Sequence, residues 1–281
     1  MSGIAAVLAP GLPRATIFFI LGAVAVAQSS GTSSCTEGFP CYLAASIANS
    51  ASSLAGPYSP NSFLTIYGTN LSYVTRPIEP GDIEAGQLPW VLTGTEVSVL
   101  VGGISAYMYY VSPNQVNVLI PSLLTPGTVT VQLENRSLYG PPVQITLTAA
   151  APALFQSDAT TVIATHGNGP LVTAASPAVP GEVVVLYATG LGETAPEAIC
   201  GFLPEMASPL ADLANFQVLL NGTPVNPQLI LYAGDAPGFA GLFQINLELP
   251  ADSPPNPEIQ IGFSSSTGSN LSPTQRFLPV Q

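Results

Sequence analysis

A chain of 281 residues with a formal net charge of −12 and no lysine cannot present the clustered cations that follow a nucleic-acid backbone or an anionic lipid surface. Its charged fraction is 7%, well below the roughly 25% that is usual for a soluble domain. With 26 glycines and 29 prolines, turns are frequent and long helices are disfavoured.

The N-terminal residues predict a secretory signal peptide over residues 1–27. Arg14 precedes an apolar run over residues 15–27, which closes on the small-x-small pattern Ala25-Val26-Ala27. The run is shorter than the about 20 residues that a membrane-spanning helix needs. We therefore expect cleavage near Gln28, no membrane span afterwards, and a protein that is secreted or held in the cell envelope. An uncleaved anchor is the alternative.

Residues 28–60 are small and polar and predict a linker. Within them, Cys35 and Cys41 could close a small disulfide loop in an oxidising compartment. Cys200 is the third cysteine, and the sequence leaves open whether it is free or paired.

Strand patterns begin at Ser62 and fill residues 61–150. Short runs of alternating or wholly apolar, β-branched and aromatic residues are separated by Gly and Pro. The dipeptide Gly102-Gly103 predicts a two-residue hairpin. Strands are expected over residues 63–67, 96–101, 106–111, 115–120, 128–133 and 143–148.

Residues 151–281 show the same succession of strand patterns. Asn221-Gly222 is the strongest short hairpin signal in the chain. Strands are expected over residues 183–187, 216–220, 229–232, 242–249, 258–263 and 276–280.

The two units also repeat one another in their residues. Residues 62–71 are echoed by residues 182–191, and residues 115–121 by residues 244–250, about 120 to 130 positions later. This period is too long for a solenoid repeat of about 20 to 50 residues, and it suits a duplicated domain. Tyr67 should then superpose on Tyr187 and Gln115 on Gln244.

The predicted fold class is therefore all-β, with two tandem Ig-like β-sandwich domains at residues 61–150 and 151–281 after the signal peptide. Leu71 and Leu191 follow the first strand of each unit. Both are expected to fill the core just beyond the strand end.

Three motifs carry a resemblance to a known family: residues 110–117 (Tyr-Val-Ser-Pro-Asn-Gln-Val-Asn), residues 186–192 (Leu-Tyr-Ala-Thr-Gly-Leu-Gly) and residues 236–246. Together they resemble the uncharacterised Solibacter C-terminal domain family, found at the ends of many secreted bacterial proteins. Each unit also resembles the IPT/TIG Ig-like domains of extracellular and cell-surface proteins. The resemblance implies export and a β-sandwich fold, and it implies no reaction, ligand or functional residue.

Groups suited to catalysis are scarce. The single histidine, His166, lies in a Gly-containing segment and is interpreted as a loop residue without chemistry. We expect no enzyme and no cofactor. A carboxylate-dependent glycoside hydrolase is the minor alternative. Its closest sequence candidates are Asp82 with Glu84 and Glu193 with Glu197.

Metal binding has weak sequence support. The cysteine spacing does not fit a zinc site. Asp158 and Asp235 are weak calcium candidates, because carboxylates in the loops of Ig-like domains can bind Ca²⁺.

Aromatic residues give the stronger binding signal. Tyr107 and Tyr109 lie two positions apart, so they share one face of a strand. That face, with Trp90 in the preceding long loop, could stack on sugar rings. Alternatively, both faces of the strand are covered by the sandwich and the neighbouring domain, and Trp90 plugs the end of the sandwich.

The leading hypothesis is an exported, non-catalytic Ig-like tandem for surface attachment, adhesion or protein assembly, with a protein or polysaccharide partner at the cell surface. The alternative is a carbohydrate-binding module that uses Tyr107, Tyr109 and Trp90. The sequence leaves the partner and the oligomeric state open.

Overall fold

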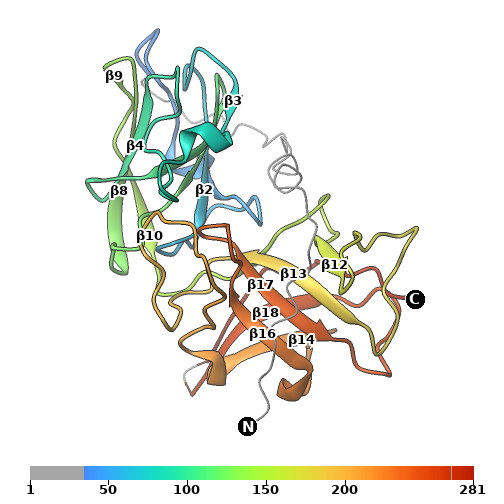
Figure 1. Cartoon of the computed structure of the whole chain (residues 1–281). Coiled ribbons are helices and arrows are strands. Elements are labelled where there is room, and N and C mark those ends of the chain that lie inside the picture. The colour runs from blue at the N-terminus through green and yellow to red at the C-terminus, as the bar shows by residue number, and fades with distance from the viewer. Residues whose placement is uncertain (1–34, 267) are drawn as a thin grey trace.

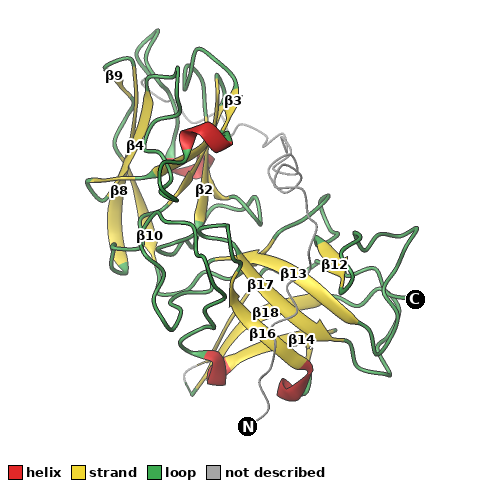
Figure 2. Cartoon of the chain, viewed as in Figure 1, coloured by secondary structure: helices red, strands yellow, loops and turns green. Residues whose placement is uncertain are grey.

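The structure is a computed structural model that describes residues 35–266 and 268–281. The expected signal peptide, residues 1–27, lies outside the described residues. In Figure 1 the blue-to-green strands form one unit and the yellow-to-red strands form a second. Figure 2 shows that strands and loops make up both units. Helix in the described ranges is confined to the short 3-10 turns Ala44–Ser46, Pro80–Asp82, Leu213–Asn215 and Pro227–Leu229.

The first unit is a sandwich of two antiparallel sheets. One sheet has the order β1-β2-β7-β6-β3 and the other β10-β8-β4-β5, with β9 paired to β8. Buried side chains such as Ile66, Val99 and Leu133 fill the space between the sheets. The strands are β1 (Ile47–Asn49), β2 (Phe63–Tyr67), β3 (Arg76–Pro77), β4 (Val97–Val101), β5 (Ile104–Ser105), β6 (Tyr107–Ser112), β7 (Gln115–Leu119), β8 (Gly127–Asn135), β9 (Leu138–Tyr139) and β10 (Val143–Leu147).

The second unit is a sandwich with the same plan. One sheet has the order β11-β13-β17-β16, with β12 paired to β13, and the other has the order β15-β14-β18-β19. Its core includes Leu186, Phe243 and Ile261. The strands are β11 (Ala153–Leu154), β12 (Ala164–His166), β13 (Val183–Thr189), β14 (Phe216–Leu220), β15 (Thr223–Pro224), β16 (Ile230–Asp235), β17 (Phe243–Glu248), β18 (Ile259–Ser265) and β19 (Gly268–Leu271).

The expected repeat is confirmed at the level of strand register. Tyr67 of β2 lies opposite Gln115 of β7, and Tyr187 of β13 lies opposite Gln244 of β17. The neighbouring ladders β6–β7 and β16–β17 each carry a register shift. The two sandwiches are therefore copies of one strand arrangement, as the duplicated sequence predicts.

The same side-chain hydrogen bond recurs on the central strand of each copy. Gln115 Nε2 donates to Asn117 Oδ1 at 3.0 Å, and Gln244 Nε2 donates to Asn246 Oδ1 at 2.7 Å. A Gln-x-Asn pattern places both amides on one face of a strand. The repeated Gln-x-Asn motif therefore has a structural role, because it forms the same side-chain hydrogen bond in each sandwich.

The two hairpins and the two expected core leucines are found where the sequence places them. Gly102 and Gly103 connect β4 to β5, and Asn221 and Gly222 connect β14 to β15. All four have positive φ, between 48° and 80°, which two-residue hairpins of this kind require. Leu71 and Leu191 are buried just beyond β2 and β13.

Residues 35–60, expected as a linker, are instead part of the first sandwich. Ile47 is fully buried and β1 pairs with β2. The hydroxyl of buried Tyr42 accepts a hydrogen bond from the Leu133 amide at 2.7 Å. The strand is only three residues long and lies among small polar residues, so no periodic pattern marks it.

Candidate functional site

The two units are joined by an apolar core of their own. Because its members are buried side chains from both sandwiches, the contact has the character of a domain interior. The larger members are Phe63, Leu88, Tyr107, Tyr109 and Leu119 from the first unit and Phe155, Ile163, Val185, Tyr187 and Leu242 from the second.

Hydrogen bonds close this interface around its apolar centre. Tyr109 Oη donates to the Ala240 carbonyl at 3.0 Å, and burial raises the pKa of this phenol. Thr189 Oγ1 accepts from the Phe63 amide at 3.2 Å. The Leu88 amide of the first unit donates to the Gly201 carbonyl of the second unit at 2.8 Å. Buried polar groups are thus paired across the interface.

The structure places the three aromatic candidates differently from one another. Tyr107 and Tyr109 are only 6% and 2% exposed, because their shared face packs on the second unit. The expectation that they form an exposed stacking surface is therefore wrong. Trp90 is 52% exposed, and its ring lies 6.3 Å from that of Tyr107 between centroids. Trp90 thus remains the one open aromatic of the three.

Cys200 lies beside this aromatic pair. The Tyr107 hydroxyl donates to the Cys200 carbonyl at 3.1 Å and lies 3.7 Å from its sulfur. Within the described residues Cys200 takes part in no disulfide. Cys35 and Cys41 do form the expected disulfide, with a Cα–Cα distance of 5.5 Å.

The first carboxylate pair considered for hydrolysis holds a structural residue. Both oxygens of buried Asp82 bind the Arg76 guanidinium, at 2.8 and 3.0 Å. The amides of Glu79 and Thr93 also donate to Asp82. Burial raises the pKa of Asp82, but these hydrogen bonds together outweigh it and hold the pKa well below its usual range. Its sequence neighbour Glu84 is exposed.

The second pair, Glu193 with Glu197, consists of exposed side chains. In neither pair are both carboxyl groups buried.

The two calcium candidates do not lie in a cluster of ligands. Asp158 Oδ1 accepts hydrogen bonds from the amides of Thr160 and Thr161 at 2.8 and 2.9 Å, which lower its pKa. Asp235 is buried at the end of β16, and this burial raises its pKa to about 6 against the opposing hydrogen bond from Thr194. In the part of the chain that the structure describes, no group of three or more His, Cys, Asp or Glu side chains could hold a metal ion.

His166 is better connected than the sequence suggested. It ends strand β12, where it pairs with Val184 of β13, so the loop interpretation is wrong. Its Nδ1 lies 2.5 Å from Glu182 Oε1, and its Nε2 lies 3.3 Å from Ser176 Oγ and 3.2 Å from the Ser176 carbonyl. Because Nε2 faces that carbonyl as well as the hydroxyl, these contacts hold the segment between β12 and β13 against the sheet.

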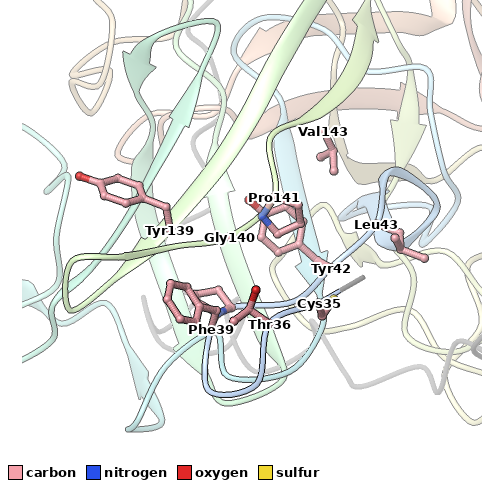
Figure 3. Close-up of a pocket in the computed structure, with 10 residues that line it drawn as sticks. Cys35, Thr36, Phe39, Tyr42, Leu43, Tyr139, Gly140, Pro141 and Val143 are labelled. Carbon is pink, nitrogen blue, oxygen red and sulfur yellow. The ribbon is translucent and has the colours of Figure 1, made fainter. Parts of the chain in front are cut away.

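An open pocket lies on the first sandwich, beside the disulfide loop. It encloses about 370 Å³, and none of the residues that line it is charged. Figure 3 shows Pro141, Gly140 and Tyr42 in the middle, Phe39 and Tyr139 on one side, and Leu43 and Val143 on the other. We call it the Tyr139 pocket.

Close packing at the floor of the Tyr139 pocket explains why residue 140 is a glycine. A Cβ on Gly140 would lie 2.4 Å from Cε1 of Tyr42, so only glycine lets the buried tyrosine ring approach the chain here. Tyr139 itself is 53% exposed. No local sequence pattern marks this pocket, because its lining combines two segments, residues 35–43 and 139–143, that lie about 100 residues apart.

Comparison with known proteins supports the fold. Residues 47–156 match the model of the IPT/TIG domain, so an IPT/TIG Ig-like domain is present in this part of the chain. The resemblance to the Solibacter-type family stays a prediction. No curated protein matches the chain. Within residues 35–266 and 268–281, no helix has the length and apolar character needed to cross a membrane.

Several solved structures share a distant likeness. SGBP-B of the Bacteroides ovatus mixed-linkage glucan utilization locus, in complex with a mixed-linkage heptasaccharide, is 13% identical with a TM-score of 0.31, and the match covers 80% of this chain and 43% of that one. The plexin A4 extracellular region is 13% identical with a TM-score of 0.27, over 90% and 19% of the two chains. The titin Ig tandem A164-A165 is 8% identical with a TM-score of 0.19, over 80% and 89%. The chain thus spans less than half the length of the first two.

Proposed function

We propose that this protein is an exported, non-catalytic Ig-like tandem that attaches or assembles components at the cell surface, with its two sandwiches acting as one rigid body. The apolar core shared by the two units carries this proposal. Tandem domains joined only by a linker move relative to one another, whereas a large apolar interface suppresses that motion. A rigid pair holds a partner at a fixed distance and direction from its own attachment point.

Composition and covalent structure support an extracytoplasmic setting. The Cys35–Cys41 disulfide is of the kind that persists in oxidising compartments. The low charged fraction and the surplus of acids disfavour nucleic acid and anionic lipid as partners. We propose a protein or polysaccharide of the cell surface as the partner.

Retention of the exported chain on isolated cell envelopes tests the proposal. Increasing amounts of purified chain, beginning near Gln28, are added to envelopes stripped of it, and the bound fraction is measured. Saturable retention that survives high salt is expected, because the chain has few charges with which to bind through electrostatics alone. Retention that never saturates, or that salt abolishes, would contradict specific attachment.

Carbohydrate binding through Trp90 is the second candidate. Its half-exposed indole lies 6.3 Å from the Tyr107 ring between centroids, and an exposed indole can stack on a sugar ring. On a polysaccharide array, Trp90→Ala should weaken the signal, and Trp90→Phe should weaken it less. Equal signals from the unchanged protein and from Trp90→Ala would rule this site out.

A further inference from the structure

The Tyr139 pocket is preformed. The Cys35–Cys41 disulfide closes the loop that carries Phe39, and the Phe39 carbonyl accepts a hydrogen bond from Asn70 Nδ2 at 3.2 Å. At the floor of the pocket, the Gly140 carbonyl accepts from Gln132 Nε2 at 3.2 Å. A ligand that enters this pocket therefore finds the disulfide loop and the floor already in place, which reduces the entropy lost on binding.

The chemistry of the lining selects a neutral ligand. Because none of the lining residues is charged, an anionic or cationic group would lose water without gaining a counter-charge. Phe39 and Pro141 offer flat or apolar surface and Thr36 brings a hydroxyl group, while the ring of Tyr139 extends outward from the other lining residues (Figure 3). The ligand must therefore combine an apolar face with groups that bind hydroxyls.

A sugar ring meets both requirements. One face of a pyranose presents C–H groups that pack on an aromatic ring, and its edge carries hydroxyls that both donate and accept hydrogen bonds. A proline-rich segment also packs on aromatic rings, and its carbonyls accept from hydroxyls, but its prolines have no N–H that could donate to a hydroxyl oxygen, whereas a sugar hydroxyl does both. The enclosed volume, about 370 Å³, lies at the lower end of the range for small-ligand pockets.

We infer that the Tyr139 pocket binds a neutral polysaccharide through one or two sugar residues, with a ring stacked on the exposed side chain of Tyr139. In Figure 1, β9, which ends at Tyr139, lies at the end of the first sandwich away from the second unit. Trp90 lies instead beside Tyr107 at the interface. The inference extends the second candidate function, carbohydrate binding, to a different site, and each site can fail alone.

Titration calorimetry of the exported chain tests the inference. The probes are cellohexaose, xylohexaose and mannohexaose, with oligogalacturonate as the charged comparison and decaproline as the peptide comparison. At least one neutral oligosaccharide should bind. Tyr139→Ala should weaken that binding about tenfold, while Tyr139→Phe, which keeps the ring, should change it by less than about threefold.

Two controls make the result specific. Tyr73 is 57% exposed and does not line the pocket, so Tyr73→Ala should bind as the unchanged protein does. Because Tyr139 is exposed, the melting temperature of Tyr139→Ala should match that of the unchanged protein.

Three outcomes would overturn the inference. They are no measurable binding of any neutral oligosaccharide at millimolar concentration, binding that Trp90→Ala abolishes and Tyr139→Ala spares, and tighter binding of decaproline or oligogalacturonate than of every neutral oligosaccharide. The envelope-retention experiment does not depend on these outcomes, so the failure of this site and the failure of the attachment function are distinguishable.

Discussion

Asp235 makes the stability of the second unit depend on pH. Burial raises the pKa of this carboxyl from 3.8 to about 6, and the Thr194 hydrogen bond only partly opposes the shift. Between about pH 4 and pH 6 the folded state therefore keeps a proton that the unfolded state releases. Stability should fall as pH rises through that window, by up to about 3 kcal/mol. Urea unfolding at half-unit pH steps measures the slope, and Asp235→Asn should flatten it.

The other shifted carboxyls act outside this window. The pKa values of Asp82 and Asp158 are lowered, so their contributions are present above the ordinary Asp pKa and are lost as pH falls below about 4. Of these three shifted carboxyls, Asp235 is therefore the one whose contribution changes between pH 4 and pH 6. A stability that rises across that interval, in a protein whose Asp235→Asn variant behaves identically, would contradict this account.

At the scale of elements, the turn after the first long strand of each sandwich depends on its leucine. Leu191 lies beyond β13 among the buried residues of the second core. Truncating a buried leucine costs about 2 to 5 kcal/mol, a large part of the about 5 to 15 kcal/mol that a small domain has. Leu191→Ala should lower the melting temperature of the protein by many degrees in a calorimetric scan. Leu213→Ala, at an exposed position of the same unit, is the matched control and should change it little.

The segment between β12 and β13 is held by His166. Its ring contacts Glu182 on one side and Ser176 on the other, and Glu182 also accepts a hydrogen bond from the Val179 amide at 3.0 Å. His166→Ala should cost about 1 kcal/mol, the usual net value of a hydrogen bond, and should speed proteolysis between residues 167 and 182. Limited proteolysis followed by mass spectrometry locates the cuts. An unchanged cleavage pattern would mean that the strand pairing alone holds this segment.

The sequence predicts the strands that are rich in apolar and β-branched residues better than those that are not. β2, β4, β13 and β14 are rich in β-branched and apolar residues, and the hairpins after β4 and β14 use Gly-Gly and Asn-Gly, so local chemistry is sufficient. β19 (Gly268–Leu271) has almost no such pattern, because it is an edge strand that pairs only with β18. A strand was expected over residues 276–280, where the described chain has only isolated bridges.

The candidate sites were harder to predict than the strands. Period-two alternation shows that Tyr107 and Tyr109 share a face, but it cannot show what covers that face. The covering residues come from the second unit, more than 40 positions further along the chain. The Tyr139 pocket likewise exists only because the disulfide loop folds against the segment after β9.

At the scale of the whole molecule, rigidity depends on how closely the two units approach at Gly201. With a φ of 74°, Gly201 lies so near Tyr107 that a Cβ would be 2.0 Å from Cζ of that ring. Gly201→Ala should therefore displace Tyr107 and loosen the interface, including the hydrogen bond from Leu88 to the Gly201 carbonyl. In the unchanged protein the two sandwiches share a core and should unfold together in one step. The Gly201→Ala variant should instead melt in two steps. Its radius of gyration, measured by X-ray scattering, should also be larger.

Gly103→Ala is the control that separates loosening from backbone strain. Gly103 has a similar φ of 80°, but no atom would lie within 4 Å of its Cβ. Both substitutions add about 1 to 2 kcal/mol of left-handed strain, and only Gly201→Ala also disturbs the interface. Gly103→Ala should therefore keep a single melting step at a lower temperature, with the radius unchanged. If both variants melted in one step with the same radius, the contact at Gly201 would not hold the units together, and the remaining core around Phe63 and Tyr187 would be sufficient.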